Sequence, residues 1–327
     1  MELVCVGCYT SGAGNGNGIR TYWHENGTLT PAAELAMSSP SWLTWHPTLD
    51  VLYAANESAD GEITVVVPDD PGTLISVASV PSGGADPCHL TVTPDGRHLL
   101  CSNYSSGSLA VFALSSEGMI ADRTDLVTHT GSGPVPDRQD SAHVHMAVVS
   151  GSIVSAVDLG TDEIRSYTLA ADGSLAPLSV SAMPPGTGPR QLLRRPGTDL
   201  AYVAGELAAT LVVVREGPAG TFTPVSVVSA TAGTFEGINY PAHLEIAGDR
   251  LYLSNRGPDV ITEFDISDLE PKAVADHPCG AFPRHFSMAG DRFFVAGQKE
   301  DAVVSFAVPD GEPVRYPTGT PTCVLFR

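Results

Sequence analysis

Basic residues are scarce in this chain: of its 327 residues, 17 are Lys or Arg and 37 are Asp or Glu, for a formal net charge of −20 at pH 7. A surface of this sign repels nucleic acids and anionic membranes, so we expect neither as a partner. No apolar run reaches the length that spans a bilayer, and no charged start followed by an apolar stretch marks a signal peptide. We therefore expect a cytoplasmic protein.

Cysteine is also rare, and the six cysteines do not form the pairs of a metal site. Cys5 and Cys8 are three positions apart, but on a strand their side chains would point to opposite faces. We expect reduced core thiols, as is usual in the cytoplasm. His143 and His145 could bind a transition metal, yet nearby arginines would disfavour a dication. We expect no metal and no cofactor.

The sequence also lacks long segments with the apolar periodicity of an amphipathic helix. It contains a repeated phrase instead. The phrase reads Pro, any residue, then His, Gln or Leu, apolar, any residue, apolar; a tight turn and a second apolar run follow. Repeats of about 40–50 residues built from short β runs indicate a β-propeller. The copies start at Pro40, Pro87, His143, Pro189, Pro241, Pro283 and Pro321.

The repeat predicts both the blade and the closure of the ring. Each copy supplies two runs joined by a turn rich in Pro, Asp and Gly, and two weaker runs follow, which makes four antiparallel strands. We therefore expect an all-β fold, a seven-bladed β-propeller that forms a single domain over residues 1–327. The last copy runs off the C-terminus, and residues 3–9 (LVCVGCY) supply its second half. The N- and C-terminal strands should thus close the ring within one blade. A pair of β-sandwiches is the alternative, and the split copy argues against it.

Polar residues gather where the strands of each repeat meet. In a blade, the start of the innermost strand and the end of the second strand lie on the same face, near the axis. Charged groups near a narrow axis are unfavourable unless they are paired or used, so this face is the candidate functional site. The first-strand starts supply His89, His143, His145, Arg190, His243, Arg284 and His285. The second-strand ends supply Tyr9, Glu57, Asn103, Tyr104, Asp158, Glu206, Arg256 and Gln298.

Several phrases resemble those of the seven-bladed lactonase family, in order, from about residue 3 to residue 326. That family contains the propeller-type 6-phosphogluconolactonases and the 3-carboxy-cis,cis-muconate lactonizing enzyme. The phrases are VGCYTSG, YAANE, GPVPDRQDSAHVH, DLGTDEI, GPRQL, AGELAAT, SNRGPDVI and FPRHF. The resemblance implies a catalytic set of His, two Arg and Glu, which falls on His143, His145, Arg190, Glu206 and Arg256. Gln191, where the family usually has His, and Gly205, where it commonly has Asn, depart from the pattern.

The residue types suit a small anionic lactone as substrate. Arg190 and Arg256 can hold a phosphate or a carboxylate through charge-assisted bonds. Glu206 should face Arg190, which would keep it ionised; either Glu206 or a histidine could then be the base. Further substrate contacts are expected from Tyr9, Glu57, Asn103, Tyr104, Arg138, Asp158, Arg284 and His285.

Three functions remain open on these residues. A 6-phosphogluconolactonase-type hydrolase is favoured; the alternatives are carboxymuconate cyclisation and a non-catalytic propeller that binds a protein or peptide. We expect a monomer or a weak homodimer. The connections 121–142 and 231–240 are the longest before a first strand, and Arg138, Gln139 and Glu236 in them are candidate contacts at substrate entry.

Overall fold

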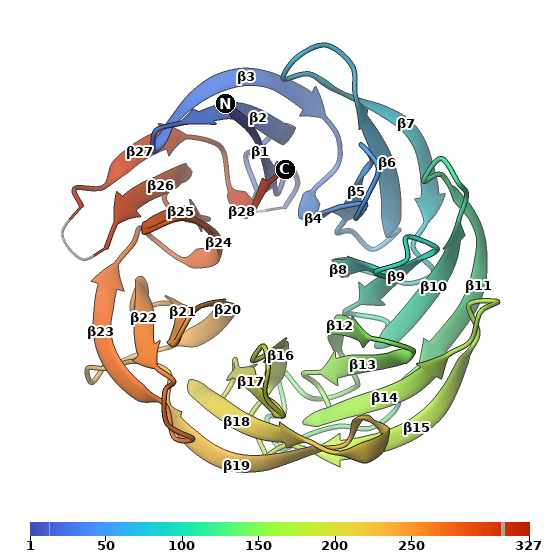
Figure 1. Ribbon diagram of the computed structural model, residues 1–327, viewed down its shortest axis with the longest axis vertical. Helices are drawn as coiled ribbons and strands as arrows, with labels where there is room; N and C mark the ends of the chain where they lie inside the picture. The colour runs from blue at the N-terminus through green and yellow to red at the C-terminus, as the bar shows by residue number, and fades with distance from the viewer. Residues whose placement is uncertain (13, 309–310) are drawn as a thin grey trace.

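The computed structural model describes residues 1–12, 14–308 and 311–327. Over these residues the chain forms seven four-stranded antiparallel sheets, arranged as blades in a ring (Figure 1). The blades follow one another around the ring in chain order, and a short 3-10 turn, η1 (Pro218–Gly220), precedes one outer strand. The prediction of an all-β, seven-bladed β-propeller is confirmed. Within the described residues, no helix has the length and apolar character that a membrane crossing requires.

Each blade presents an innermost strand to the axis, and a second strand returns antiparallel beside it (Figure 1). The innermost strands are β4 (Pro40–Trp45), β8 (Pro87–Val92), β12 (Val144–Ser150), β16 (Pro189–Arg194), β20 (Tyr240–Ala247), β24 (Pro283–Ala289) and β28 (Pro321–Phe326). The second strands are β5 (Leu52–Asn56), β9 (His98–Asn103), β13 (Ile153–Asp158), β17 (Leu200–Gly205), β21 (Arg250–Arg256), β25 (Arg292–Gly297) and β1 (Glu2–Cys8).

Two more strands complete each blade toward its rim. The third strands are β2 (Gly18–Glu25), β6 (Glu62–Pro68), β10 (Ser108–Leu114), β14 (Glu163–Leu169), β18 (Thr210–Glu216), β22 (Val260–Asp265) and β26 (Ala302–Ala307). The outermost strands are β3 (Thr28–Ala36), β7 (Leu74–Pro81), β11 (Ile120–Thr128), β15 (Leu175–Ala182), β19 (Phe222–Ser229), β23 (Lys272–Pro278) and β27 (Val314–Pro317). Because β11 takes up residues 120–128, the predicted connection 121–142 is in part a strand.

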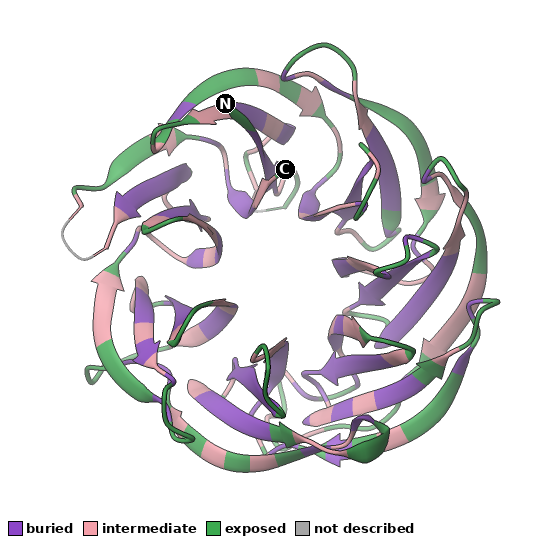
Figure 2. Cartoon of the chain, in the orientation of Figure 1, coloured by how far each residue is buried: buried purple, intermediate pink, exposed green. Residues whose placement is uncertain are grey.

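The core lies between neighbouring blades rather than at the axis. Strands such as β5, β9 and β17 are buried along their whole length, because a blade packs against each of their faces. Such strands read as short continuous apolar runs, which is the signal that the repeat carries. The outermost strands are largely exposed, as Figure 2 shows by colour. All six cysteines are buried and unpaired.

The ring closes by pairing the two ends of the chain. β28 pairs antiparallel with β1, in a register from Val4 opposite Phe326 to Cys8 opposite Pro321. Both termini lie in this blade (Figure 1). Cys323 and Val324 from β28 pack into two different core clusters, one on each side of the blade. The predicted closure by the N- and C-terminal strands is confirmed.

Deleting residues 321–327 should lower the melting temperature by more than about 10 °C. The truncation removes buried core side chains and leaves the β1 edge unpaired, and losses of this kind reach several kcal/mol. Differential scanning calorimetry measures the effect, with deletion of Arg327 alone as the control. A truncated protein that melts with the full-length chain would contradict a ring held by β28.

Candidate active site

A β-bulge at the start of each inner strand directs one side chain toward the axial face. In the blade of β8, Pro87 pairs with Asn103 and His89 with Ser102, so Cys88 is the extra residue. Bulges re-aim a side chain and are common beside active sites. The same shift makes His145, Arg190 and Arg284 the extra residues of β12, β16 and β24.

In several blades, the residue directly after the second strand lies at the same end of the blade as the bulged residue. Glu57 follows Asn56, which pairs with Pro40, and Glu206 follows Gly205, which pairs with Pro189. The backbone N–H of this residue donates to the carbonyl before the inner strand, at 2.9 Å from Glu57 to Ser39 and 2.9 Å from Glu206 to Gly188. Tyr9 and Tyr104 have the same bond, to Thr320 and Asp86.

In five blades the residue that accepts this bond is held in the left-handed region. The φ angles are 37° at Ser39, 54° at Asp86, 58° at Phe282 and 36° at Thr320, and only Gly188 (56°) adopts this region without strain. Strained residues of this kind cluster at functional sites. Their place, directly before the bulged strands, fixes the direction in which the axial side chains leave the backbone.

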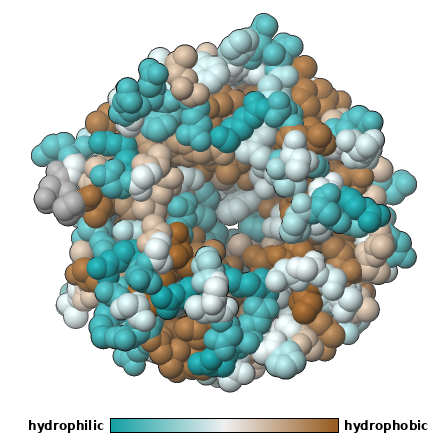
Figure 3. All heavy atoms as spheres, in the orientation of Figure 1, coloured by the Kyte–Doolittle hydropathy of each residue, from teal (hydrophilic) through white to brown (hydrophobic). Residues whose placement is uncertain are grey.

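These positions enclose a cavity of about 290 Å³ on the ring axis. Figure 3 shows a central hollow in the face that it draws, with hydrophilic and hydrophobic side chains around it. A volume of this size suits a small ligand. The cavity is lined by Glu57, Cys88, Tyr104, Arg138, His145, Arg190, Glu206, Arg256 and Arg284.

Three arginines surround Glu206 on one side of the cavity. Arg138 Nη2 is 2.7 Å from Oε1, and Oε2 accepts from Arg190 Nη1 at 3.0 Å and from Arg256 Nη2 at 2.7 Å. Burial opposes ionisation of Glu206, but the charges of Arg256 and Arg190 hold its pKa well below the usual range. Glu206 therefore stays ionised, with both oxygens engaged.

His145 adjoins the same group. Its Nε2 lies 2.5 Å from Arg190 Nη1 and accepts from it, because a guanidinium only donates. Burial, with the charge of Arg190, holds the pKa of His145 well below its usual range, so the ring is neutral. The Cys88 thiol donates to the His145 carbonyl at 3.3 Å. The only free lone pair of the neutral ring is thus taken by Arg190.

The other side of the cavity carries a second carboxylate with different partners. The Tyr9 hydroxyl donates to Glu57 Oε1 at 2.7 Å, and Arg284 Nη2 lies 3.5 Å from Glu57 Oε2, outside good hydrogen-bond geometry. The Arg284 guanidinium packs over the Tyr9 ring, 5.1 Å from its centroid. Among the described residues, Arg284 has no side-chain hydrogen-bond partner.

The cavity carries positive charge in a strongly acidic protein. Its lining contains the four arginines Arg138, Arg190, Arg256 and Arg284 and the two glutamates Glu57 and Glu206, a balance of four minus two, or two positive charges. The chain as a whole carries −20. Positive charge concentrated in a walled cavity attracts an anionic ligand.

Most of the predicted site residues line this cavity, but two of the predicted catalytic and binding histidines lie behind its wall. His143 stacks on Tyr104 with ring centroids 4.4 Å apart, and its Nδ1 bonds the Tyr104 carbonyl at 3.0 Å. His285 lies against His243, with centroids 3.8 Å apart, and beside Trp42.

The predicted substrate contacts Asn103 and Asp158 lie one residue too early in their repeats, and the structure places both away from the cavity. Asn103 is buried and donates to the Ser82 carbonyl and the Ser108 hydroxyl. Asp158 accepts from the His143 N–H at 2.8 Å and bonds His129 at 2.7 Å. Both therefore stabilise the blade ends.

Of the three residues predicted to contact substrate from the entry loops, one lies at the cavity and two do not. Arg138 reaches Glu206, whereas the Gln139 amide donates to the Leu159 carbonyl and to Asp162, and Glu236 is exposed in the loop before β20. Sequence reasoning missed Cys88 as a lining residue. A signal was available, because Cys88 follows its proline as Arg190 and Arg284 follow theirs.

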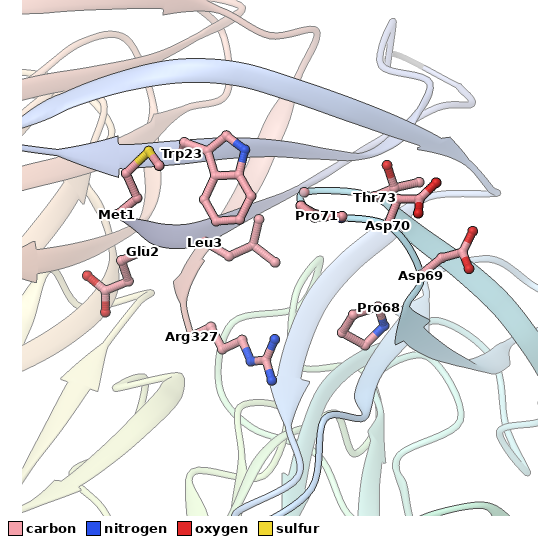
Figure 4. Close-up of a pocket in the computed structure, with 11 residues that line it drawn as sticks. Met1, Glu2, Leu3, Trp23, Pro68, Asp69, Asp70, Pro71, Thr73 and Arg327 are labelled. Atoms are coloured by element: carbon pink, nitrogen blue, oxygen red, sulfur yellow. The ribbon is translucent and has the colours of Figure 1, made fainter.

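A larger hollow of about 500 Å³ lies at the other end of β1 and β28. Figure 4 shows Trp23, Leu3 and Arg327 facing the turn 68–73, which carries Asp69 and Asp70. Its one arginine, Arg327, is paired with Asp50 rather than gathered with other arginines. The bulged positions do not reach it, so the axial cavity is the candidate active site.

The bulged strands of the propeller bring arginines and carboxylates together in one axial cavity. The chain belongs to the lactonase, 7-bladed β-propeller family, whose family model matches residues 3–326. It is 30% identical over 271 residues to the 6-phosphogluconolactonase of Bacillus subtilis (strain 168), a match that covers 80% of this chain and 77% of the relative.

Two solved structures share the whole fold. The periplasmic gluconolactonase PpgL of Pseudomonas aeruginosa has a TM-score of 0.88 and 27% identity, with 99% of this chain and 98% of PpgL covered. A protein from Lactobacillus plantarum has a TM-score of 0.90 and 27% identity, with 100% and 99% covered.

Proposed function

We propose that this protein hydrolyses a small lactone that carries a phosphate, and that 6-phosphogluconolactone is its substrate. The observation that carries the proposal is the surplus of two positive charges in the axial cavity. A phosphate monoester carries about −1.5 to −2 at pH 7, which matches that surplus. The names of the relative from Bacillus subtilis and of PpgL support lactone hydrolysis over cyclisation and over a binding module.

Arg190 and Arg256 are the proposed phosphate ligands. Their Nε atoms donate to the Ala242 and Tyr240 carbonyls at 3.1 and 3.0 Å, and one Nη of each donates to Glu206. The second Nη of each has no partner among the described residues and remains available to an anion. Glu206 acts here as a positioning residue that holds the guanidiniums in place before the ligand arrives.

The reaction is ester hydrolysis within a ring. A water oxygen bonds to the lactone carbonyl carbon, the bond from that carbon to the ring oxygen breaks, and the product is an open hydroxy acid. Negative charge develops on the carbonyl oxygen in the transition state. Fixed guanidinium donors stabilise such charge best in a site from which water is largely excluded.

The remaining expectations stay predictions. A small anionic lactone is the proposed partner, neither nucleic acid nor a membrane is expected, and a monomer or weak homodimer is expected in solution. A cytoplasmic location also stays a prediction, and PpgL is named as periplasmic.

The purified protein should release acid from 6-phosphogluconolactone faster than the spontaneous reaction does. Gluconolactone without the phosphate should react with kcat/KM lower by about 10²–10⁴, because two charge-assisted bonds of about 1.5–3 kcal/mol each are lost. A pH-stat assay measures both substrates. Equal kcat/KM for the two lactones would contradict a phosphate site, and no acceleration of either would contradict lactone hydrolysis.

A further inference from the structure

The hydrolysis needs a group that accepts a proton from water, and two candidates are already engaged. Glu206 has both oxygens bonded to guanidiniums, and those charges keep its pKa far below that of an efficient base. His145 uses its free lone pair on Arg190. The third acid–base group that lines the cavity is Glu57.

Glu57 has one oxygen held by a hydrogen bond, and the other has only the ion pair with Arg284 at 3.5 Å. Oε1 accepts from the Tyr9 hydroxyl at 2.7 Å. Oε2 is buried without a hydrogen-bond partner among the described residues. A buried carboxylate oxygen without a hydrogen-bond partner is unfavourable by about 1–3 kcal/mol or more, and a bound water or a catalytic role can account for it. This oxygen belongs to a residue that lines the cavity, so it can accept a hydrogen bond from a bound water there.

Glu57 and Glu206 occupy the same position in two different blades, directly after Asn56 and Gly205. Their environments differ: three arginines bond Glu206, whereas Glu57 has one tyrosine bond and one arginine at 3.5 Å. Two carboxylates placed in unlike environments divide their roles in other hydrolases as well. The strongly bonded one organises charge and the weakly bonded one moves a proton.

We infer that Glu57 is the general base of the reaction and that Arg284 beside it stabilises the oxyanion; the inference rests on the proposed lactone hydrolysis. Glu57 Oε2 takes a proton from water as the water oxygen bonds to the lactone carbonyl carbon. The ring C–O bond then breaks, and Glu57 returns the proton to the departing ring oxygen. No oxidant or cofactor takes part, and the carboxylate is regenerated.

Arg284 fits the second role because, among the described residues, its one ion pair is the 3.5 Å contact with Glu57. The guanidinium is mostly buried, with 14% of the side chain exposed, and it makes no hydrogen bond to a described residue. Burial works against its charge, but Tyr9 and Glu57 keep its pKa above the usual range, so it remains a cation. An oxyanion held next to Glu57 would meet these donors without displacing any protein bond.

Two other titratable groups near Glu57 stay neutral. Burial keeps the pKa of the Tyr9 phenol well above its usual range, so it stays protonated and donates to Glu57. Burial also raises the pKa of the Cys88 thiol, which is therefore neutral. In this arrangement the lactone binds with its phosphate at Arg190 and Arg256 and with its carbonyl at Arg284 and Glu57.

The test compares Glu57→Gln, Glu206→Gln and Glu62→Gln, the last an exposed glutamate of β6 as matched control. With 6-phosphogluconolactone, Glu57→Gln should lower kcat by about 10²–10⁴ while the Kd for inorganic phosphate stays near that of the wild type. Glu206→Gln should raise the phosphate Kd, and Glu62→Gln should change neither. A Glu57→Gln enzyme with wild-type kcat overturns the inference and leaves the function intact. A wild type without activity on either lactone overturns the function, and the inference with it.

Tyr9→Phe provides a second readout should Glu57→Gln fold poorly. The variant keeps the ring under Arg284 and removes the hydrogen bond that orients Glu57 Oε1. The value of kcat should fall by about 10–10²-fold while the Kd for inorganic phosphate stays near that of the wild type, a split that a purely structural tyrosine would not produce. A wild-type kcat, in a variant with wild-type melting temperature, would contradict the role of Glu57.

Discussion

Replacing both Arg190 and Arg256 with alanine should lower kcat/KM for 6-phosphogluconolactone by about 10²–10⁴. Each guanidinium presents one free Nη to the ligand, and each charge-assisted bond is worth about 1.5–3 kcal/mol. The loss should fall mostly on KM, since the phosphate lies away from the reacting carbonyl. Steady-state kinetics and titration calorimetry with inorganic phosphate measure the two effects.

Lysine at either position should restore the phosphate affinity only in part. A planar guanidinium can donate to Glu206 and to an anion at the same time, and an ammonium cannot reproduce this geometry. Arg215→Ala, which breaks an exposed pair with Asp199, serves as the control and should be neutral. Alanine variants with wild-type kinetics and wild-type phosphate affinity would show that these arginines only support the fold.

Replacing Glu206 with glutamine should lower the free energy of unfolding by about 3–5 kcal/mol at pH 7. The change leaves three guanidiniums around a neutral amide, and removal of one partner from a buried ion pair is strongly destabilising. Urea unfolding measures it. Glu300→Gln, which loses an exposed partner in Arg315, should cost less than about 1 kcal/mol.

For Glu206→Gln we also expect a defined pH dependence of the free energy of unfolding. The folded-state pKa of Glu206 lies well below its ordinary value of 4.5, so its contribution is fully present above that value. The contribution is lost as the pH falls below 4.5 toward the folded-state pKa. The stability difference between wild type and Glu206→Gln should therefore be constant near neutrality and shrink in acid. A difference that grows in acid would contradict the assigned charge state.

The fold was predictable because the second strands are packed on both faces. Burial forces each of them into a short apolar run next to an inner strand that carries a proline at its start in six of the seven blades. This pair of strands repeats seven times, with one copy split between the ends of the chain. The outermost strands are exposed and carry a weak pattern. For this reason residues 121–128 read as part of a loop, although they lie in β11.

The site was predictable in its residue types and less so in its exact positions. A strand has a period of two, and a bulge shifts that period by one residue without a signature in composition. Asn103 and Asp158 were therefore expected at the cavity, although in the blade of Asn103 the next residue, Tyr104, is the one that lines it. In the β12 blade, Val144 takes the place of the proline, which moves His143 out of the site and His145 into it. The contact of Arg138 with Glu206 depends on the course of a loop.

A crystal structure with the reaction product, 6-phosphogluconate, would show directly which arginines hold the phosphate. We expect the product to occupy the axial cavity, with its phosphate on the free Nη atoms of Arg190 and Arg256. Its carboxylate, formed from the lactone carbonyl, should lie against Arg284 within hydrogen-bond distance of Glu57. A product bound with its phosphate at Arg284, or in the hollow beside Trp23 and Arg327, would contradict it.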